Sequence, residues 1–244
     1  MQDPLDDTLV VPETTLNRIT WIDGDGRSAF PLRHLGGDAP GGDDQLPNGL
    51  QRLDHAGRSY LLASYRSGSA GAGAGHLSLW DVTAVDPALV WTFPPDGALD
   101  TPHAPVLRER GGRWWLLWAH THGSAAGGTV GVAWTDDPTV VPAYVADLVA
   151  PAPAAPLVYL RGVELTDDGA LYLTDGGSLG GIGGTEPRGR LLRAPLPEGL
   201  APTGASGDAH QDQVFVDLES AEILREALDN PFEGWLWDGG FTGR

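Results

Sequence analysis

A short pattern recurs three times in this chain of 244 residues. Each copy is a polar turn closed by glycine, followed by an aromatic and aliphatic segment, and the copies are residues 53–62, 107–117 and 165–173. Their turn glycines are Gly57, Gly112 and Gly169, which lie 55 and 57 residues apart. Repeats of about 50 residues that each contain several strand-like segments are typical of propeller blades. The pattern therefore predicts an all-β fold, a β-propeller.

The repeat divides the middle of the chain into three blade-like units, at residues 49–91, 104–145 and 157–196. A chain of this length fits one large all-β domain, so we expect residues 1–244 to form a single propeller. Residues 1–16 are expected to be irregular or an edge segment, and residues 17–32 read as a hairpin.

Near the end of the chain the periodicity changes. Ala221, Leu224, Ala227 and Leu228 recur at helical spacing, Ser220 is a suitable N-cap, and Asn230-Pro231 would stop a helix. These signals predict one short C-terminal helix over residues 220–228.

Composition excludes several classes of function. The chain has 15 basic and 33 acidic residues, a formal net charge of -18, which disfavours binding to nucleic acid or to an anionic membrane surface. It contains no apolar run of the ~20 residues that a spanning helix needs, so we expect no membrane insertion. Cysteine is absent, which excludes disulfides and thiolate sites. The first residues lack a signal-peptide pattern, so the sequence leaves the compartment open. Our expectation is an extracellular or surface-associated location.

The second unit carries the most specific sequence pattern. It contains Ala-Pro-Val at 104–106, an aromatic strand at 112–118, and Val-Gly-Val-Ala-Trp-Thr-Asp-Asp-Pro at 130–138. These motifs resemble the five-bladed propellers of the glycoside hydrolase family 43 and 32 superfamily, over roughly residues 45–200. The segment 161–175 resembles the six-bladed gluconolactonase-like propellers to a similar degree. The first resemblance implies five blades and a glycan ligand.

The chain departs from the family 43 pattern at two places. The family's first blade begins with a catalytic Asp in an Asp-Pro turn, whereas this chain has Asp43-Asp44-Gln45. The family's acid is a Glu just before the apolar strand of a later blade. At the nearest matching place stands Arg161-Gly162-Val163, with Glu164 three positions on.

Residues just before the innermost strand of each blade are expected to line a shared axial pocket. In this chain Asp44, Asp100 and Glu164 occupy such positions and are the candidate catalytic carboxyls. A glycosidase needs one protonated and one ionised carboxyl, ~5–5.5 Å apart for retention or ~6.5–9.5 Å for inversion. The alternative is that these are solvated loop acids in an acidic chain. The candidate substrate-binding residues are His103, Arg161 and Trp91.

His120 and His122 are two residues apart, so on a strand they share a face and are candidate metal ligands. The family 43 resemblance makes a calcium ion near an axial histidine conceivable. Without a third ligand at fixed spacing, hydrogen-bonded loop histidines are the alternative.

Three functions remain open. The leading hypothesis is a carbohydrate-active, glycoside hydrolase-like propeller that hydrolyses or binds a glycan in an axial pocket. The second is a non-catalytic propeller for recognition or assembly, on a cell surface or a virion. The third is a calcium-dependent lactonase or esterase-like propeller. A cluster of two or three carboxyls would favour the first, and acids with an Asn around one calcium ion would favour the third.

Overall fold

The computed structural model describes residues 9–13, 18–22, 45–67, 75–84, 86–95, 99, 102–120, 128–149, 160–175, 190–202, 215–218 and 222–226. Within these ranges all regular secondary structure is β-strand. The all-β prediction is confirmed for this part of the chain. No helix that could cross a membrane occurs among the described residues.

Three sheets, each built on antiparallel neighbouring strands, correspond to the three sequence units. The first has the order β3-β4-β5-β6, formed by β3 (Gln45–His55), β4 (Arg58–Ser67), β5 (His76–Asp81) and β6 (Ala88–Phe93). The second begins with β7 (Pro102–Arg110), β8 (Arg113–His120), β9 (Thr129–Thr135) and β10 (Ala143–Val149). The third begins with β11 (Leu160–Leu165), β12 (Ala170–Asp175) and β13 (Arg190–Pro195). We call these sheets blades one, two and three.

Two late strands complete the outer edges of blades two and three. After β13 the chain supplies β14 (Phe215–Asp217), which pairs in parallel with β10, the outer strand of blade two. It then supplies β15 (Glu222–Glu226), which pairs antiparallel with β13 in blade three. A further two-stranded sheet, β1 (Leu9–Glu13) and β2 (Arg18–Ile22), lies beside β3.

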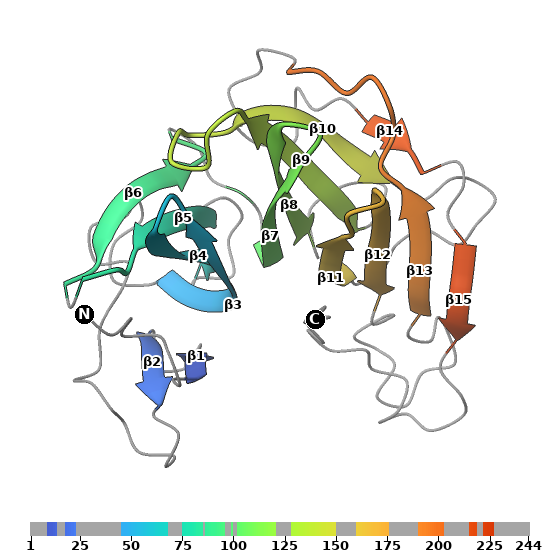
Figure 1. Cartoon of the computed structure of the whole chain (residues 1–244). Helices are drawn as coiled ribbons and strands as arrows, with labels where there is room; N and C mark the ends of the chain where they lie inside the picture. Colours follow the sequence, from blue (N-terminus) through green and yellow to red (C-terminus); the bar gives the residue numbers. More distant parts are fainter. Residues whose placement is uncertain are drawn as a thin grey trace, which may run out of the picture.

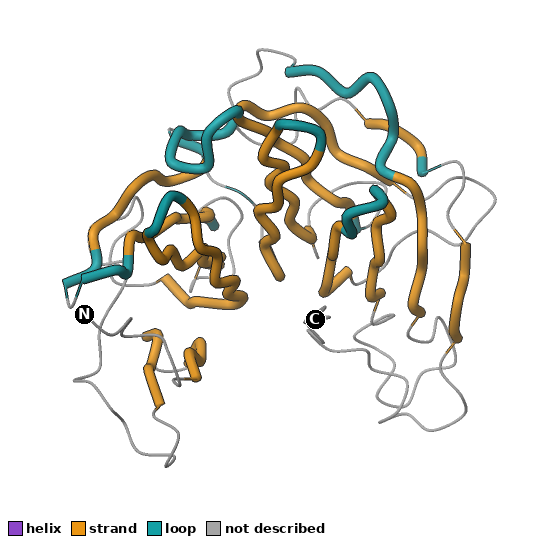
Figure 2. The backbone as a smooth tube through the Cα atoms, viewed as in Figure 1, coloured by secondary structure: helices purple, strands orange, loops and turns teal. Residues whose placement is uncertain are grey.

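The blades form an arc, with the strands β3, β7 and β11 along its inner side (Figure 1). The described chain consists of strands joined by loops and turns, without a helix (Figure 2). The hairpins that connect β3 to β4, β7 to β8 and β11 to β12 contain the repeat glycines, with φ of +76°, +76° and +86° at Gly57, Gly112 and Gly169. Glycine adopts this left-handed conformation at little cost, which explains why the repeat places it there.

Apolar side chains fill the space between blades one and two and between blades two and three. Trp118 on β8 is fully buried and packs against Phe93 of blade one, with ring centroids 5.2 Å apart. A second cluster joins blades two and three through side chains such as Leu117 and Leu173. Burial on both faces explains why β8, the second strand of blade two, reads as a nearly continuous apolar run.

Two sequence predictions need correction. The helix predicted over 220–228 is wrong, because Glu222–Glu226 form β15. The outer edge of β13 offers a row of backbone hydrogen-bonding groups, and pairing with them outweighs a weak local helical periodicity. Within residues 1–16, where we expected irregular structure or an edge segment, Leu9–Glu13 form β1. The predicted hairpin over 17–32 begins with β2, but β2 pairs with β1; residues 23–32 lie outside the described residues.

Candidate functional site

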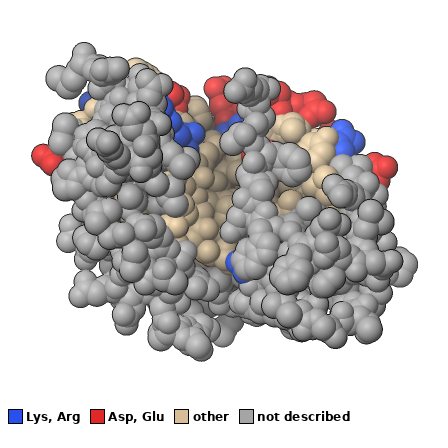
Figure 3. All heavy atoms as spheres, turned by 90° about the horizontal axis from the view of Figure 1, so that it is seen from below, with Lys and Arg blue, Asp and Glu red and all other residues tan. Residues whose placement is uncertain are grey.

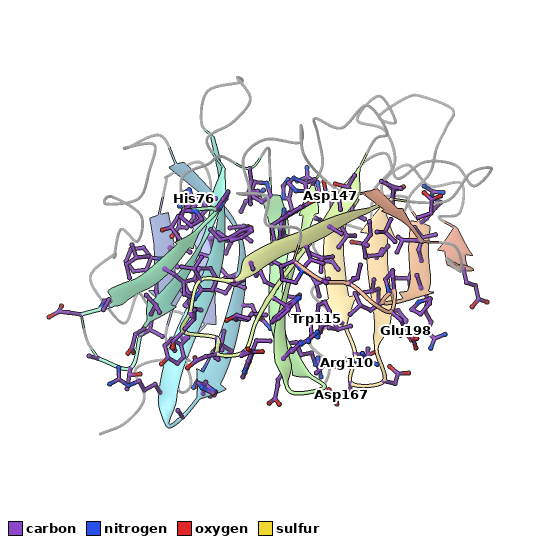
Figure 4. The ribbon with its side chains drawn as sticks, turned by 90° about the horizontal axis from the view of Figure 1, so that it is seen from above. His76, Arg110, Trp115, Asp147, Asp167 and Glu198 are labelled. Carbon is purple, nitrogen blue, oxygen red and sulfur yellow. The ribbon has the colours of Figure 1, made fainter. Side chains whose placement is uncertain are left out.

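The three innermost strands run in the same direction and begin at the same end of the blades. Side-chain contacts fix this alignment: Asn48 meets His103, and Gln51 Nε2 donates to the Leu107 carbonyl at 3.4 Å. We call the end where β3, β7 and β11 begin the leading end, and the opposite end the turn end. His76 and Asp147 lie at the leading end, whereas Arg110 and Asp167 lie at the turn end (Figure 4).

Each innermost strand carries a bulge near its start. Asn48 is the extra residue where the β3–β4 register shifts between Pro47 and Gly49, and Arg161 is the extra residue between Leu160 and Gly162. In β7 the register shifts between His103 and Val106. A bulge interrupts the alternation of a strand and redirects the side chains around it. Three bulges at equivalent positions thus direct residues from three blades toward one another.

The side chains so directed are Asn48, His103 and Arg161. The Nδ2 atom of Asn48 contacts both ring nitrogens of His103, Nε2 at 3.0 Å and Nδ1 more closely. Arg161 Nη1 lies 2.8 Å from Nε2 and 3.1 Å from Nδ1 of the same ring. His103 is 1% exposed and Arg161 6% exposed, whereas Asn48 is only half-buried. We call this group the inner cluster.

The guanidinium group of Arg161 lies within hydrogen-bond distance of the His103 ring. Arginine is always charged and only donates hydrogen bonds, so the ring nitrogen that accepts from Nη1 must carry a lone pair. The neutral form of the His103 imidazole has one such nitrogen. A calcium ion at that nitrogen would meet the positive guanidinium, so the inner cluster does not fit a cation.

Close backbone approach makes the cluster possible. A Cβ atom added to Gly49 would lie 2.7 Å from the Ala104 backbone nitrogen, so only glycine lets β3 approach β7 here. Ala104, the residue after His103, has φ of +40°, a conformation that non-glycine residues rarely adopt. Backbone strain of this kind tends to occur at functional sites.

Buried polar side chains gather at the leading end around this cluster. They are His76, His103, His120, Thr129, Asp147, Arg161, Thr174, Asp175 and Arg190. The buried pair Arg190 and Asp175 is joined by a 2.5 Å ion pair between Nη2 and Oδ2. Burial and the charge of Asp147 raise the pKa of the Tyr144 hydroxyl, which keeps it protonated. The described surface seen in Figure 3 is mostly uncharged in its middle, with red and blue side chains along one edge and a blue group at the opposite margin.

Glu164, one of the candidate carboxyls, lies toward the turn end of β11. Its Oε1 accepts a 3.0 Å ion pair from Arg108 Nη1, and Arg108 Nη2 lies 2.8 Å from Asp167 Oδ1. Burial raises the pKa of Glu164, although the Arg108 guanidinium opposes the shift. The structure thus gives this carboxyl a role in joining blades two and three.

Trp91 does not offer a surface for a sugar ring. It is 4% exposed within the apolar cluster between blades one and two, and its indole Nε1 donates to the Pro138 carbonyl at 2.8 Å. We expected a stacking surface because Trp91 falls near the end of its unit, but β6 continues to Phe93 and is buried by the turn that follows β9. Trp91 is therefore a packing residue between blades.

His120 also has a structural role. Its Nε2 accepts a 2.5 Å hydrogen bond from Trp118 Nε1, so that nitrogen has no lone pair left for a metal. Within the described ranges, no three His, Asp or Glu side chains come together as a metal site. Asp44, Asp100 and His122 lie outside the described residues, so their predicted roles remain predictions.

The sequence did not predict that Asn48 would lie beside His103 and Arg161. An Asn at this position was considered only as a ligand of a hypothetical calcium ion. The signal for it was the dipeptide Asn48-Gly49, which corresponds to Arg161-Gly162 in the third unit. In both, a bulged polar residue precedes a glycine at the start of an innermost strand.

Solved structures similar to this chain include family 43 glycoside hydrolases. One is a GH43_1 enzyme from Xanthomonas citri, with 17% identity, a TM-score of 0.40, and coverage of 72% of this chain and 55% of that one. The same enzyme complexed with xylotriose gives 17% identity, a TM-score of 0.42, and coverage of 81% and 60%. The third is CoXyl43, a GH43 β-xylosidase/α-arabinofuranosidase from a compost microbial metagenome, with 15% identity, a TM-score of 0.40, and coverage of 66% and 57%.

The chain therefore spans a little more than half the length of these structures. No protein-family model matches the chain, and no curated protein matches it.

Proposed function

We propose that this protein is a carbohydrate-active, glycoside hydrolase-like propeller that binds a glycan at the leading end of its blades. The observation that carries the proposal is the inner cluster, in which bulges in three blades direct Asn48, His103 and Arg161 to one place. Sugar hydroxyls and ring oxygens are recognised by fixed polar side chains of this kind, held by a rigid scaffold. We also propose that the whole chain is one propeller with five blades.

For catalysis, we propose Asp44 and Asp100 as the two carboxyl groups that glycoside hydrolysis requires. Asp44 immediately precedes β3, and Asp100 lies two residues before β7. Glu164 is the weaker candidate of the original three, because its ion pair with Arg108 holds it toward the turn end.

Binding is the first property to test. Titration calorimetry with xylan, arabinan and fructan oligosaccharides should give binding to at least one of them, weakened in Asn48→Ala. Arg110→Gln is the matched control, because it changes a polar side chain at the turn end and should leave affinity unchanged. If the parent binds no glycan in these series, the proposal is wrong.

Turnover is tested separately with aryl glycosides and the same oligosaccharides. One positioned proton-transfer group contributes ~10²–10⁴-fold, so Asp100→Asn should lower kcat by that factor with little change in thermal stability. A parent that binds glycans without cleaving any would exclude the catalytic assignment.

That result would favour the second candidate, a non-catalytic recognition propeller. The observation on its side is the chemistry of the inner cluster, whose members are an amide, an imidazole and a guanidinium. None of these three groups is the carboxyl that glycoside hydrolysis requires.

A further inference from the structure

The exposed large apolar side chains of the described residues lie on two neighbouring elements. Leu89 on β6 is 40% exposed, and Val140 and Val141, in the turn between β9 and β10, are 56% and 38% exposed. The two elements are in contact, because the Trp91 indole of β6 donates to the Pro138 carbonyl of that turn. Single exposed apolar residues need no explanation, whereas a group of them on adjoining elements marks an interaction surface. We call the three exposed side chains the rim patch.

The strand beside this patch, β6, is also the edge of a sheet. Within the described ranges β6 pairs with β5 alone, and it lies on the outer side of the arc (Figure 1). Its sequence, Ala-Leu-Val-Trp-Thr-Phe, is rich in strand-forming residues and has no charge or proline to discourage a further strand. Blade two shows that such an outer edge accepts a strand from a distant segment, because β14 pairs with β10 there.

Exposed acidic side chains adjoin the rim patch. Asp86 comes just before β6, and Asp136 and Asp137 lie in the same turn as the two exposed valines. The backbone N–H and the hydroxyl of Thr139 donate to Asp137 at 2.8 and 2.7 Å, which lowers the pKa of this carboxyl and keeps it ionised. The segments 86–95 and 135–142 contain no Lys, Arg or His. The charge around the patch is therefore negative.

Two basic side chains of blade one approach this region from the turn between β3 and β4. Arg58 is compensated, because its Nη1 lies 2.7 Å from Asp81 Oδ2. The ring of His55 packs edge-on against Trp114, with centroids 5.2 Å apart, and a positive charge on it would face Asp137. Neither side chain changes the sign of the local charge at neutral pH, since an unperturbed imidazole is mostly neutral there.

We infer that the rim patch and β6 together bind an extended segment of a partner protein, apolar in its middle and basic at its flanks. The segment would add to β6 as a further strand, cover the rim patch with its apolar side chains, and place Lys or Arg near Asp86 and Asp136. The net charge of -18 favours approach of a basic partner and disfavours a second copy of this chain. The surface lies on the outer strand of blade one, so the inference is independent of the glycan site proposed at the innermost strands.

Synthetic peptides serve as the probe. A panel of capped, fluorescein-labelled peptides Lys-x-Thr-x-Thr-x-Lys, with valine, isoleucine or tyrosine at x, is titrated with the whole chain at low salt and followed by fluorescence anisotropy. At least one should bind, and the same peptide with glutamate in place of both lysines should bind about tenfold or more weakly. Proline in place of the middle x removes a backbone donor and should weaken binding by a similar factor.

Charge reversal locates the site. In the double variant Asp86→Lys/Asp136→Lys the preference should reverse, so that the glutamate peptide binds more tightly than the lysine peptide. Glu109→Lys/Glu198→Lys is the matched control, because it makes the same change in net charge at exposed positions of blades two and three and should retain the preference for lysine. Leu89→Ser, which leaves the charge unchanged, should weaken binding of the lysine peptide about tenfold. Thermal unfolding confirms that each variant is folded.

The outcomes decide between occupants. Binding of none of the panel by the parent overturns the inference, and so does an equal change of preference in the two double variants, because the effect would then be one of net charge. Sedimentation equilibrium of the parent alone should show a monomer. A concentration-dependent dimer that Leu89→Ser dissociates would show that the rim patch takes a second copy of this chain, and would also overturn the inference.

Discussion

Gly131 on β9 stands where the fold tolerates no side chain, and Gly131→Ala should destabilise the protein strongly. An added Cβ would lie 2.1 Å from Cε2 and 2.2 Å from Cζ2 of Trp118. Trp118 cannot easily move, because it is fully buried and its indole donates to His120. Overpacking a core costs about 1–3 kcal/mol, and this rigid neighbour places the substitution at the upper end, about 3 kcal/mol.

For a chain of this size, each kcal/mol lowers Tm by about 2–4 °C, so Gly131→Ala should lose about 6–12 °C. Differential scanning calorimetry measures the loss. The matched control is Gly112→Asn, where a Cβ meets nothing within 4 Å and asparagine tolerates the φ of +76°. The control should change Tm by less than about 2 °C, since surface changes cost within about 0.5 kcal/mol.

A double-mutant cycle tests the proposed cause. Trp118→Phe removes the ring atoms that Cβ would meet, so adding it to Gly131→Ala should cost less than the sum of the two single changes. If Gly131→Ala lowers Tm by less than about 2 °C, or if the two costs are additive, the packing account is refuted.

Three further predictions concern stability. Asp175→Asn should cost about 3–5 kcal/mol by urea unfolding, because it leaves Arg190 as a charged group in a buried pair; a cost under about 1 kcal/mol would contradict this. Trp91→Phe should lower the free energy of unfolding by about 1–3 kcal/mol, because the buried Pro138 carbonyl loses its indole donor. An unchanged midpoint of urea unfolding would argue against that role. Burial raises the pKa of Glu164 in the folded state, so its contribution to stability is fully present below the unfolded pKa and is lost as pH rises through the folded one. The Tm of Glu164→Gln minus the Tm of the parent should therefore increase as the pH rises from 4 to 7. A decrease of this difference over the same range would contradict the burial argument.

The sequence predicted strands well where local signals decide them. The aromatic strand expected at 112–118 corresponds to β8, Arg113–His120, and the apolar part of the motif at 130–138 lies in β9, Thr129–Thr135. A glycine turn followed by a continuous apolar segment leaves few alternatives for a chain that must bury both faces of a sheet. The sequence did not reveal that Trp91 is buried, because the turn that covers it belongs to the neighbouring blade and lies far away in the sequence.

The candidate site was harder to predict because contacts between distant segments determine it. Asn48 meets His103 only because bulges in β3 and β7 redirect both residues, and a bulge has no reliable sequence signal beyond an isolated glycine. The helix predicted over 220–228 failed for the same reason, since the free edge of β13 lies far away in the sequence. His103 and Arg161 could be considered together from the sequence because each stands at the start of an innermost strand, β7 or β11; their substrate-binding role stays a prediction.

The route of the chain after β13 has a consequence for how the molecule opens. The chain leaves blade three, adds β14 to the edge of blade two, and returns to blade three as β15. One segment of the chain thus supplies the outer strands of both blades. The outer edge of blade two and that of blade three are therefore linked covalently, and we expect them to unfold together. In hydrogen exchange, the amides of these two outer rims should become accessible as a single cooperative unit, while the rim of blade one at β6 opens independently.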